Sequence, residues 1–203
     1  MVLITNMDAS LIERCRDNDA AAFNEIVAKY KNKVYSYVCR MVGPGDDAED
    51  LTQETFVRAY VNMKSFQSRS SLNTWLYRIA TNICIDFSRK NSRVRAHAAS
   101  LTYESEDGEG EVERDIPDFR FDPQSMLLNK ELGAKLDLAL KSLPEKLRVV
   151  VVLHDIQGLQ YEEIAAVVEC PLGTVKSRLF NARASLREKL MPYLDNGLHG
   201  SVR

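Results

Sequence analysis

The sequence has little of what most enzymes and secreted proteins require. Its four cysteines stand far apart without a CxxC pair, and its three histidines are isolated from them. This spacing favours reduced structural thiols over a metal site or a disulfide framework. No Ser/His/Asp set, glycine-rich phosphate loop or metal-spaced ligand cluster is present. We therefore expect no catalytic residue, no metal and no cofactor, and only turnover in an assay would revive the enzyme alternative.

Long apolar runs are also missing. The run Val149–Leu153 is far shorter than the ~20 residues that a bilayer-spanning helix needs. The first ten residues, MVLITNMDAS, carry no positively charged leader of the kind that precedes a secretory signal. The sequence thus predicts a soluble, cytoplasmic chain that does not insert into a membrane.

Charge is unevenly distributed along the chain. The formal net charge of −2 argues at first sight against a nucleic-acid partner. Residues 101–123, however, hold nine carboxylates and two arginines, a net of −7, so everything outside that stretch sums to +5. A polar segment with so much like charge is typical of a flexible tether. We expect two domains, residues 8–96 and 125–192, joined by an acidic linker at residues 97–124.

Helical spacing of apolar residues dominates both expected domains, and no alternating run supports a strand. The predicted fold class is all-α, with two small helical domains joined by the linker, the second containing a helix-turn-helix. Breaks fall at GPGDD in the first domain and at CPLG in the second. The expected helices cover residues 8–18, 20–42, 47–63, 71–89, 125–140, 144–156, 161–168 and 174–190.

The last two expected helices, joined by ECPLG, have the layout of a helix-turn-helix, whose second helix lies in the major groove. Four apolar residues would form its buried face: Val175, Leu179, Ala182 and Leu186. Phe180 falls on the opposite face, where an aromatic edge can rest on a thymine methyl beside polar groups that read base edges. Arg178 and Arg183 on the flanks would hold phosphates. The alternative is that Phe180 packs on a neighbouring helix or domain.

The expected helix at 47–63 has an outward face of mixed character. Asp50 and Glu54 are one turn apart and repel each other, and Val57 and Val61 beside them would be apolar in water. Docking to a basic, partly apolar protein surface explains this mixture. Alternatively, early carboxylates merely favour the positive end of the helix dipole, which accounts for Asp50 but not for the valines.

The expected helix at 71–89 buries one apolar side, in which we place Trp75. Tyr77, Arg78 and Asn82 point away from that side, and the helix ends in a basic segment. Aromatic, amide and guanidinium groups together suit single-stranded DNA, whose bases can stack and be read on their pairing edges. A solvated polar face is the other interpretation of the same residues.

Three ordered motifs, DAEDLTQETFVRAY, SSLNTWLYRIATN and LPEKLRVVVVLHDIQGLQYEEIAAVVECPLGTVKSRLFNARA, resemble bacterial sigma factors of the extracytoplasmic-function (ECF) group in the sigma-70 family. The resemblance covers residues 8 to 190 and is weakest in the linker. It implies a transcription initiation factor that binds core RNA polymerase, through the β′ clamp coiled coil and the β subunit, and promoter DNA at the −35 and −10 elements. It also implies an anti-sigma factor as a further partner.

The resemblance assigns three sets of residues. The polymerase set is Asp50, Gln53, Glu54 and Phe56. The −10 set is Phe66, Tyr77, Arg78, Asn82, Arg89 and Lys90, in which Asn82 would help capture an unpaired base. The −35 set is Thr174, Lys176, Ser177, Arg178, Phe180, Asn181 and Arg183. Asn181 departs from relatives that carry arginine there, which puts in doubt any transfer of their promoter sequences. A rival hypothesis, a dimeric helix-turn-helix regulator, leaves the acidic face of the third helix unexplained.

Overall fold

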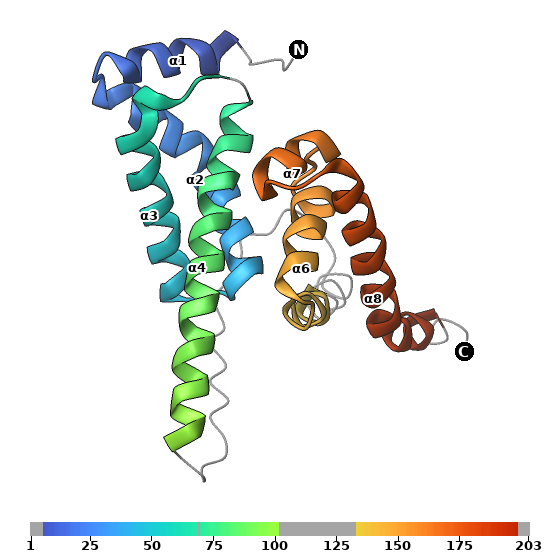
Figure 1. The fold of residues 1–203 in the computed structure, drawn as a ribbon. Coiled ribbons are helices and arrows are strands. Elements are labelled where there is room, and N and C mark those ends of the chain that lie inside the picture. The colour runs from blue at the N-terminus through green and yellow to red at the C-terminus, as the bar shows by residue number, and fades with distance from the viewer. Residues whose placement is uncertain (1–5, 69, 102–132, 199–203) are drawn as a thin grey trace.

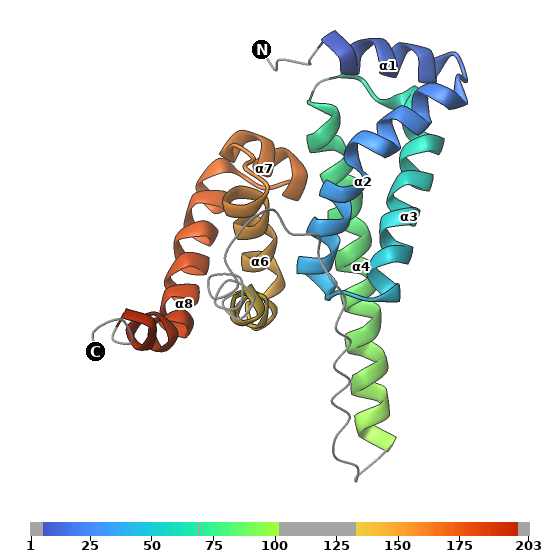
Figure 2. The same cartoon turned by 180° about the vertical axis from the view of Figure 1, so that it is seen from behind.

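The structure is a computed structural model of residues 1–203, and it describes residues 6–68, 70–101 and 133–198. Within these ranges the regular structure is helical and contains no strand, which confirms the all-α prediction. Helices α2, α3 and α4 lie side by side, and α1 crosses one end of them (Figure 1). A second group, α6 to α8, lies beside α4, as the view from behind also shows (Figure 2).

The first domain contains four α-helices, three of which match the predicted bounds within two residues. The elements are α1 (Asn6–Arg16), α2 (Ala20–Val42), α3 (Asp46–Asn62), a 3₁₀ turn η1 (Met63–Ser65) and α4 (Leu72–Leu101). The exception is α4, which we expected to end near residue 89. No proline or glycine interrupts the sequence from Leu72 to Leu101, so nothing local stops the helix. It therefore continues into the predicted linker at 97–124, whose remaining residues lie outside the described ranges.

The second domain begins, among the described residues, with a helix at 133–141, so the first part of the predicted 125–140 helix is not described. The elements that follow are α6 (Glu145–Val151), a π-helical turn η2 (Val152–Ile156), α7 (Tyr161–Val168) and α8 (Leu172–Leu198). The helix expected at 144–156 is present as α6 followed directly by the π turn. In this turn the Gln157 N–H donates to the Val152 carbonyl at 3.0 Å. Helix α7 has its predicted bounds, whereas α8 starts two residues earlier than expected and runs beyond 190.

The turn between α2 and α3 depends on two glycines. Gly43 and Gly45 have φ angles of +105° and +136°, which side chains other than hydrogen rarely tolerate. The Gly43 N–H donates to the Cys39 carbonyl at 2.8 Å and closes the end of α2. The chain can then reverse within GPGDD and lay α3 back against α2.

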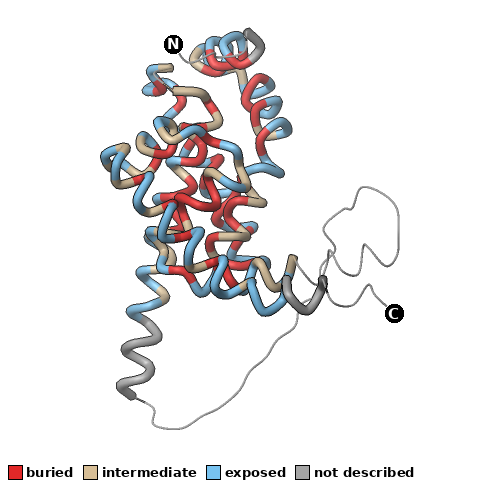
Figure 3. The backbone as a smooth tube through the Cα atoms, turned by 90° about the vertical axis from the view of Figure 1, so that its right-hand side faces the viewer, coloured by how far each residue is buried: buried red, intermediate tan, exposed pale blue. Residues whose placement is uncertain are grey.

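Apolar stripes predicted from periodicity form the core (Figure 3). The buried stripe of α3 is Ala48, Leu51, Thr55 and Ala59 and continues with Met63 of η1, and that of α8 is Val175, Leu179, Ala182 and Leu186. Trp75, expected in the core, is only half-buried, because it lies at the edge of the first domain with its ring 4.8 Å from that of Phe66. The hydrophobic pattern therefore locates the core well, except at its margin.

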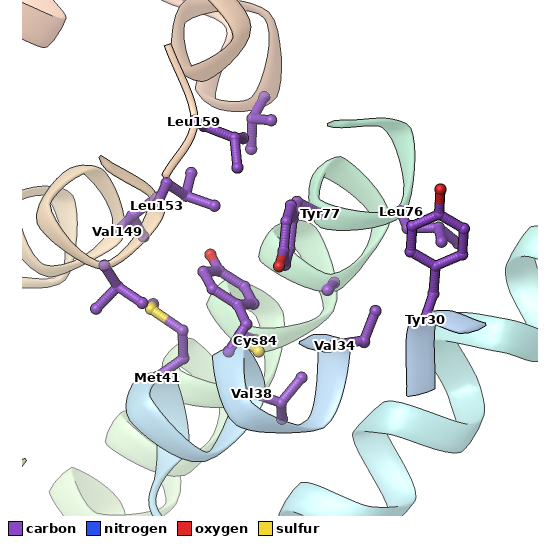
Figure 4. Close-up of a cluster of buried hydrophobic side chains, with 14 of the residues drawn as sticks. Tyr30, Val34, Val38, Met41, Leu76, Tyr77, Cys84, Val149, Leu153 and Leu159 are labelled. Carbon is purple, nitrogen blue, oxygen red and sulfur yellow. The ribbon is translucent and has the colours of Figure 1, made fainter. Parts of the chain in front are cut away.

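The core does not stop at the boundary between the domains. Met41 and Tyr77 of the first domain face Val149, Leu153 and Leu159 of the second, and each of these side chains is at most 3% exposed (Figure 4). Burying apolar side chains of this size stabilises a contact by roughly 1.5–3 kcal/mol each. The two domains thus pack together through a continuous apolar cluster rather than through surface charges alone.

Asp19 caps the N-terminus of α2, and its removal is expected to lower stability in a pH-dependent way. Its carboxylate accepts from the backbone N–H groups of Ala21 and Ala22 at 2.9 and 3.2 Å and from Arg14 Nε at 2.9 Å. The hydrogen bond from Arg14, followed by that from Ala22, lowers the pKa of Asp19. This stabilisation is complete above the unfolded-state pKa of about 3.9 and is lost as pH falls through the lower folded-state pKa.

We therefore expect Asp19→Ala to lower the urea midpoint at pH 7, and the difference from the natural chain to shrink below about pH 4. Asp19→Asn should fall between them, since asparagine retains the cap but not the ion pair. Equal midpoints for all three chains at pH 7 would show that the cap contributes nothing.

Candidate nucleic-acid and protein interfaces

Helix α3 carries the predicted acidic and apolar face. Asp50, Gln53 and Glu54 are exposed, and Val57 and Val61 beside them are 62% and 72% exposed. Large apolar side chains next to carboxylates, with no neighbouring element covering them, are typical of a protein-binding surface. The arrangement of these five residues on one face agrees with the sequence analysis.

Two details of α3 differ from expectation. Glu54 accepts from Arg58 Nε at 2.9 Å, one turn further on, so the repulsion from Asp50 is partly compensated. Phe56, assigned to the polymerase set, is 7% exposed and lies in the core of the first domain. Helical periodicity explains this, because Phe56 shares its face with buried Thr52 and Ala59. Phe56 can orient α3 but offers almost no surface to a partner.

The −10 set on and near α4 divides into exposed and covered members. The exposed side chains are Arg78, Asn82, Arg89 and Lys90. Phe66 is 4% exposed and packs on Trp75, while Tyr77 is 1% exposed. Tyr77, predicted to point away from the core, instead donates its hydroxyl to Gln157 Oε1 at 2.6 Å. Burial raises the pKa of Tyr77.

Buried hydroxyl groups beneath this face connect α4 to α2 through hydrogen bonds. Thr81 donates to the Tyr77 carbonyl at 2.6 Å, so the hydroxyl of Tyr37 is the donor in its 2.7 Å hydrogen bond to Thr81. The rings of Tyr37 and Tyr77 meet edge to face, with centroids 5.2 Å apart. Burial raises the pKa of Tyr37 well above its ordinary value. These contacts hold α4 in one rotation about its own axis. They therefore set the direction in which Arg78 and Asn82 point.

Helices α7 and α8 form the predicted helix-turn-helix. Helix α7 begins with a capping box, in which Glu163 accepts from the Gln160 N–H at 3.0 Å. It ends at Glu169, which adopts a left-handed conformation with φ of +50°. Pro171 then precedes α8, and its carbonyl accepts from the Thr174 N–H at 2.9 Å. This local chemistry sets the angle at which α8 leaves the turn.

The outward face of α8 is free of intramolecular packing at its centre. Phe180 is 75% exposed, and Lys176, Ser177 and Asn181 around it are also exposed. Phe180 lines a groove with a volume of 760 Å³ together with Lys176 and Met191. The alternative that Phe180 packs on a neighbouring helix or domain is therefore wrong for this structure.

Two arginines of the −35 set already have partners inside the second domain. Arg183 Nε donates to Asp155 Oδ2 at 3.0 Å, and this ion pair raises the pKa of Arg183. Arg178 Nη1 lies 3.7 Å from Cys170 Sγ and is half-buried. Thr174 is half-buried too, so neither arginine nor Thr174 is as open as Phe180. The sequence contained no signal for the Asp155 contact, because that residue sits in the unanticipated π turn.

Residues far apart in the sequence also meet in the contact between the two domains. Arg148 of α6 donates to the Met41 carbonyl at 2.6 Å, at the negative end of α2, and burial lowers the pKa of Arg148. Thr74 donates to Glu163 Oε1 at 2.8 Å. These contacts join residues about 90 to 107 positions apart, and spacing along the chain could not have predicted them.

Metal and membrane sites receive no support from the described residues. Among residues 6–68, 70–101 and 133–198, no group of three or more His, Cys, Asp and Glu side chains is arranged to hold a metal ion. No helix in those same ranges combines the length and apolarity that crossing a membrane requires.

Comparison with known proteins identifies both helical domains. Residues 26–94 match the family Sigma-70 region 2, and residues 133–186 match Sigma-70, region 4. The ECF RNA polymerase sigma-E factor of Escherichia coli K12 is 38% identical over 188 residues, covering 92% of this chain and 96% of that protein. The sigma-E factor of Haemophilus influenzae is 35% identical over the same length.

Solved structures agree with this assignment. The sigma factor RpoE of Bartonella quintana, solved in complex with the anti-sigma factor NepR, has a TM-score of 0.65 and 27% identity, covering 83% of this chain and 96% of that one. CnrH, solved with the cytosolic domain of CnrY, has the same TM-score at 23% identity, covering 92% and 99%. The CnrH similarity concerns the fold.

The exposure of Phe180 gives a direct test of its role. Phe180→Ala should change the free energy of unfolding by no more than about 0.5 kcal/mol, because the side chain has little packing to lose. The matched variant Leu179→Ala removes a side chain that is 2% exposed and should cost about 2–5 kcal/mol. Urea denaturation measures both, and a large loss in Phe180→Ala would mean that this ring is structural.

Proposed function

The chain belongs to the ECF group of the sigma-70 family and directs promoter-specific transcription initiation, and from this premise we propose which of its surfaces carry out each step. The exposed face of α3 binds core RNA polymerase, the outward side of α4 binds the −10 element, and the outward face of α8 reads the −35 element. The observation that carries the proposal is the exposure of Phe180 on a polar and cationic face of α8. Packing within the chain does not explain an aromatic side chain at this position.

Polymerase binding is assigned to Asp50, Gln53 and Glu54, with Val57 and Val61 at the apolar edge. Carboxylates attract a basic partner surface over a distance. Valines stabilise the complex only when the partner excludes water from them. Together they favour the β′ clamp coiled coil as the partner. Phe56 supports α3 from inside rather than touching the polymerase.

Binding of the −10 element is assigned to Asn82, with Arg78, Arg89 and Lys90 holding the strand. An amide can pair with the exposed edge of an unstacked base, and the cations neutralise phosphates. Tyr77 and Phe66 contribute by placing Asn82, because both rings are buried. The duplex then opens around a captured base, and the polymerase performs the phosphodiester chemistry.

The −35 element is assigned to α8. Phe180 and Asn181 lie where a recognition helix meets base edges, so the ring can contact thymine methyl groups and the amide can pair with adenine. Lys176 and Ser177 extend this face. Arg178 and Arg183 hold phosphates in an orientation set by Cys170 and Asp155.

The chain acts in the cytoplasm and has no catalytic activity of its own. An anti-sigma factor controls it, which is supported by the relative from Bartonella quintana solved with such a partner. The charge of only +5 outside residues 101–123 indicates weak binding to DNA in the absence of polymerase.

The docking assignment predicts that Asp50→Ala with Glu54→Ala weakens binding to core polymerase on the order of tenfold, equivalent to ~1.4 kcal/mol. The control removes two exposed carboxylates elsewhere, by Glu13→Ala with Asp17→Ala, and should leave the affinity unchanged. Fluorescence anisotropy of the labelled chain measures both. If the two double variants bind equally well, α3 is not the docking surface.

The base-capture assignment predicts that Asn82→Ala slows promoter opening on the order of tenfold, since one base contact contributes ~1–3 kcal/mol. Binding to the closed duplex should change much less. Stopped-flow fluorescence of a base analogue in the −10 element, with polymerase present, follows opening. An unchanged opening rate would remove Asn82 from the base pocket.

A further inference from the structure

The second domain lies beside α4 (Figures 1 and 2), and the two domains leave a cavity of 190 Å³ between them. Ile85 of α4, Val149 of α6 and Val167 of α7 form its apolar wall, and the two valines are each 2% exposed. The cavity shares no residue with the groove beside Phe180. It is therefore a separate candidate site, for which the promoter and polymerase assignments name no ligand.

Positive charge gathers around this cavity from three different helices. Arg89 of α4, Lys146 of α6 and Arg178 of α8 line it together. Like charges that share a cavity repel one another, and the repulsion is stronger beside an apolar wall than in water. An anion placed among the three side chains would replace this repulsion by attraction.

Two carboxylates also line the cavity, and neither forms an ion pair with the three cations. Glu169 already pairs with Arg78, which does not line the cavity. Glu145 attracts Arg148, whose pKa is lowered by burial and raised by this attraction. The described residues thus supply positive charge at the cavity that no carboxylate pairs with.

Arg178 is the most informative of the three cations. Its side chain is half-buried, and its Nη1 lies 3.7 Å from Cys170 Sγ, a weak acceptor. Burying a guanidinium without an anionic partner costs free energy, so such groups normally contact an anionic oxygen. Asn82 at the same cavity is exposed and has an amide NH₂ that can donate to an anion. Guanidinium, ammonium and amide donors together suit phosphate oxygens.

We propose that the cavity binds a small phosphate-type oxyanion, held by Arg178, Lys146 and Arg89, with the Asn82 amide donating to it. A water molecule occupies about 30 Å³ in the liquid, so a cavity of 190 Å³ has room for one phosphate group. The anion contacts side chains of both domains and stabilises the contact between them. Arg89, Asn82 and Arg178 also belong to the sets proposed to contact promoter DNA, but the inference does not depend on that assignment.

Inorganic phosphate, titrated into the isotope-labelled full chain at constant ionic strength, tests the proposal. The backbone amide signals of residues at the cavity should shift along a saturable curve in the two-dimensional NMR spectrum. Lys146→Ala should raise the dissociation constant at least tenfold, because it removes one of the three cations. Lys31→Ala removes an exposed lysine of α2 that does not line the cavity, and it should leave the dissociation constant unchanged.

Three results would overturn the proposal. The first is the absence of any shift at the cavity. The second is a shift that grows linearly with phosphate, as expected when a salt acts on the whole protein surface. The third is an equal affinity in the natural chain and in Lys146→Ala, which would place the anion elsewhere.

A second titration distinguishes a free phosphate ion from the phosphate of a nucleotide. ATP presents the same oxygen chemistry, and Lys146→Ala should weaken its binding if its phosphates enter the cavity. Binding of ATP at least tenfold tighter than that of phosphate, with both weakened by Lys146→Ala, would identify a nucleotide as the ligand. Equal or tighter binding of inorganic phosphate would identify the free ion. Binding of ATP that Lys146→Ala leaves unchanged, without binding of phosphate, would overturn the proposal.

Discussion

The packing of α4 against two partners at once is the constraint on which the rest of the structure depends. One side of the helix joins α2 and α3 in the core of the first domain, and another meets α7 of the second. Tyr77 stands at the junction, with its ring against Tyr37 and its hydroxyl on Gln157. The same contact includes the ion pair of Arg78 with Glu169, and Asn82 lines the cavity beside it.

The charge of +5 outside residues 101–123 is modest for a DNA-binding chain. On α4 Arg78 already pairs with Glu169, and two arginines of the second domain are engaged with Asp155 and Cys170. Nonspecific attraction to DNA depends on neutralised phosphates and is therefore weak. The face of α3 proposed to bind polymerase is exposed, with Val57 and Val61 at 62% and 72%.

Local rules predicted the parts of the structure that depend on neighbours in sequence. Helices α2 and α7 have their predicted bounds, and the stripes of α3 and α8 are buried as expected. The structure departs from the predictions at the end of α4, at Trp75, which is half-buried, and at Tyr77, which is buried instead of pointing away from the core. Helical periodicity places Phe56 on the buried face with Ala59, whereas the resemblance assigns it to the polymerase set. Tyr77 packs on Tyr37 and donates to Gln157, 80 residues away, and no local pattern encodes these contacts.

The most direct test of the account is run-off transcription by bacterial core polymerase, with and without this chain, on promoter-length DNA randomised at both element positions. Specific start sites should appear only when the chain is present, and the enriched −35 sequences should change when Phe180 or Asn181 is replaced. If a core polymerase that is active with another initiation factor starts nowhere new in the presence of this chain, the account is contradicted.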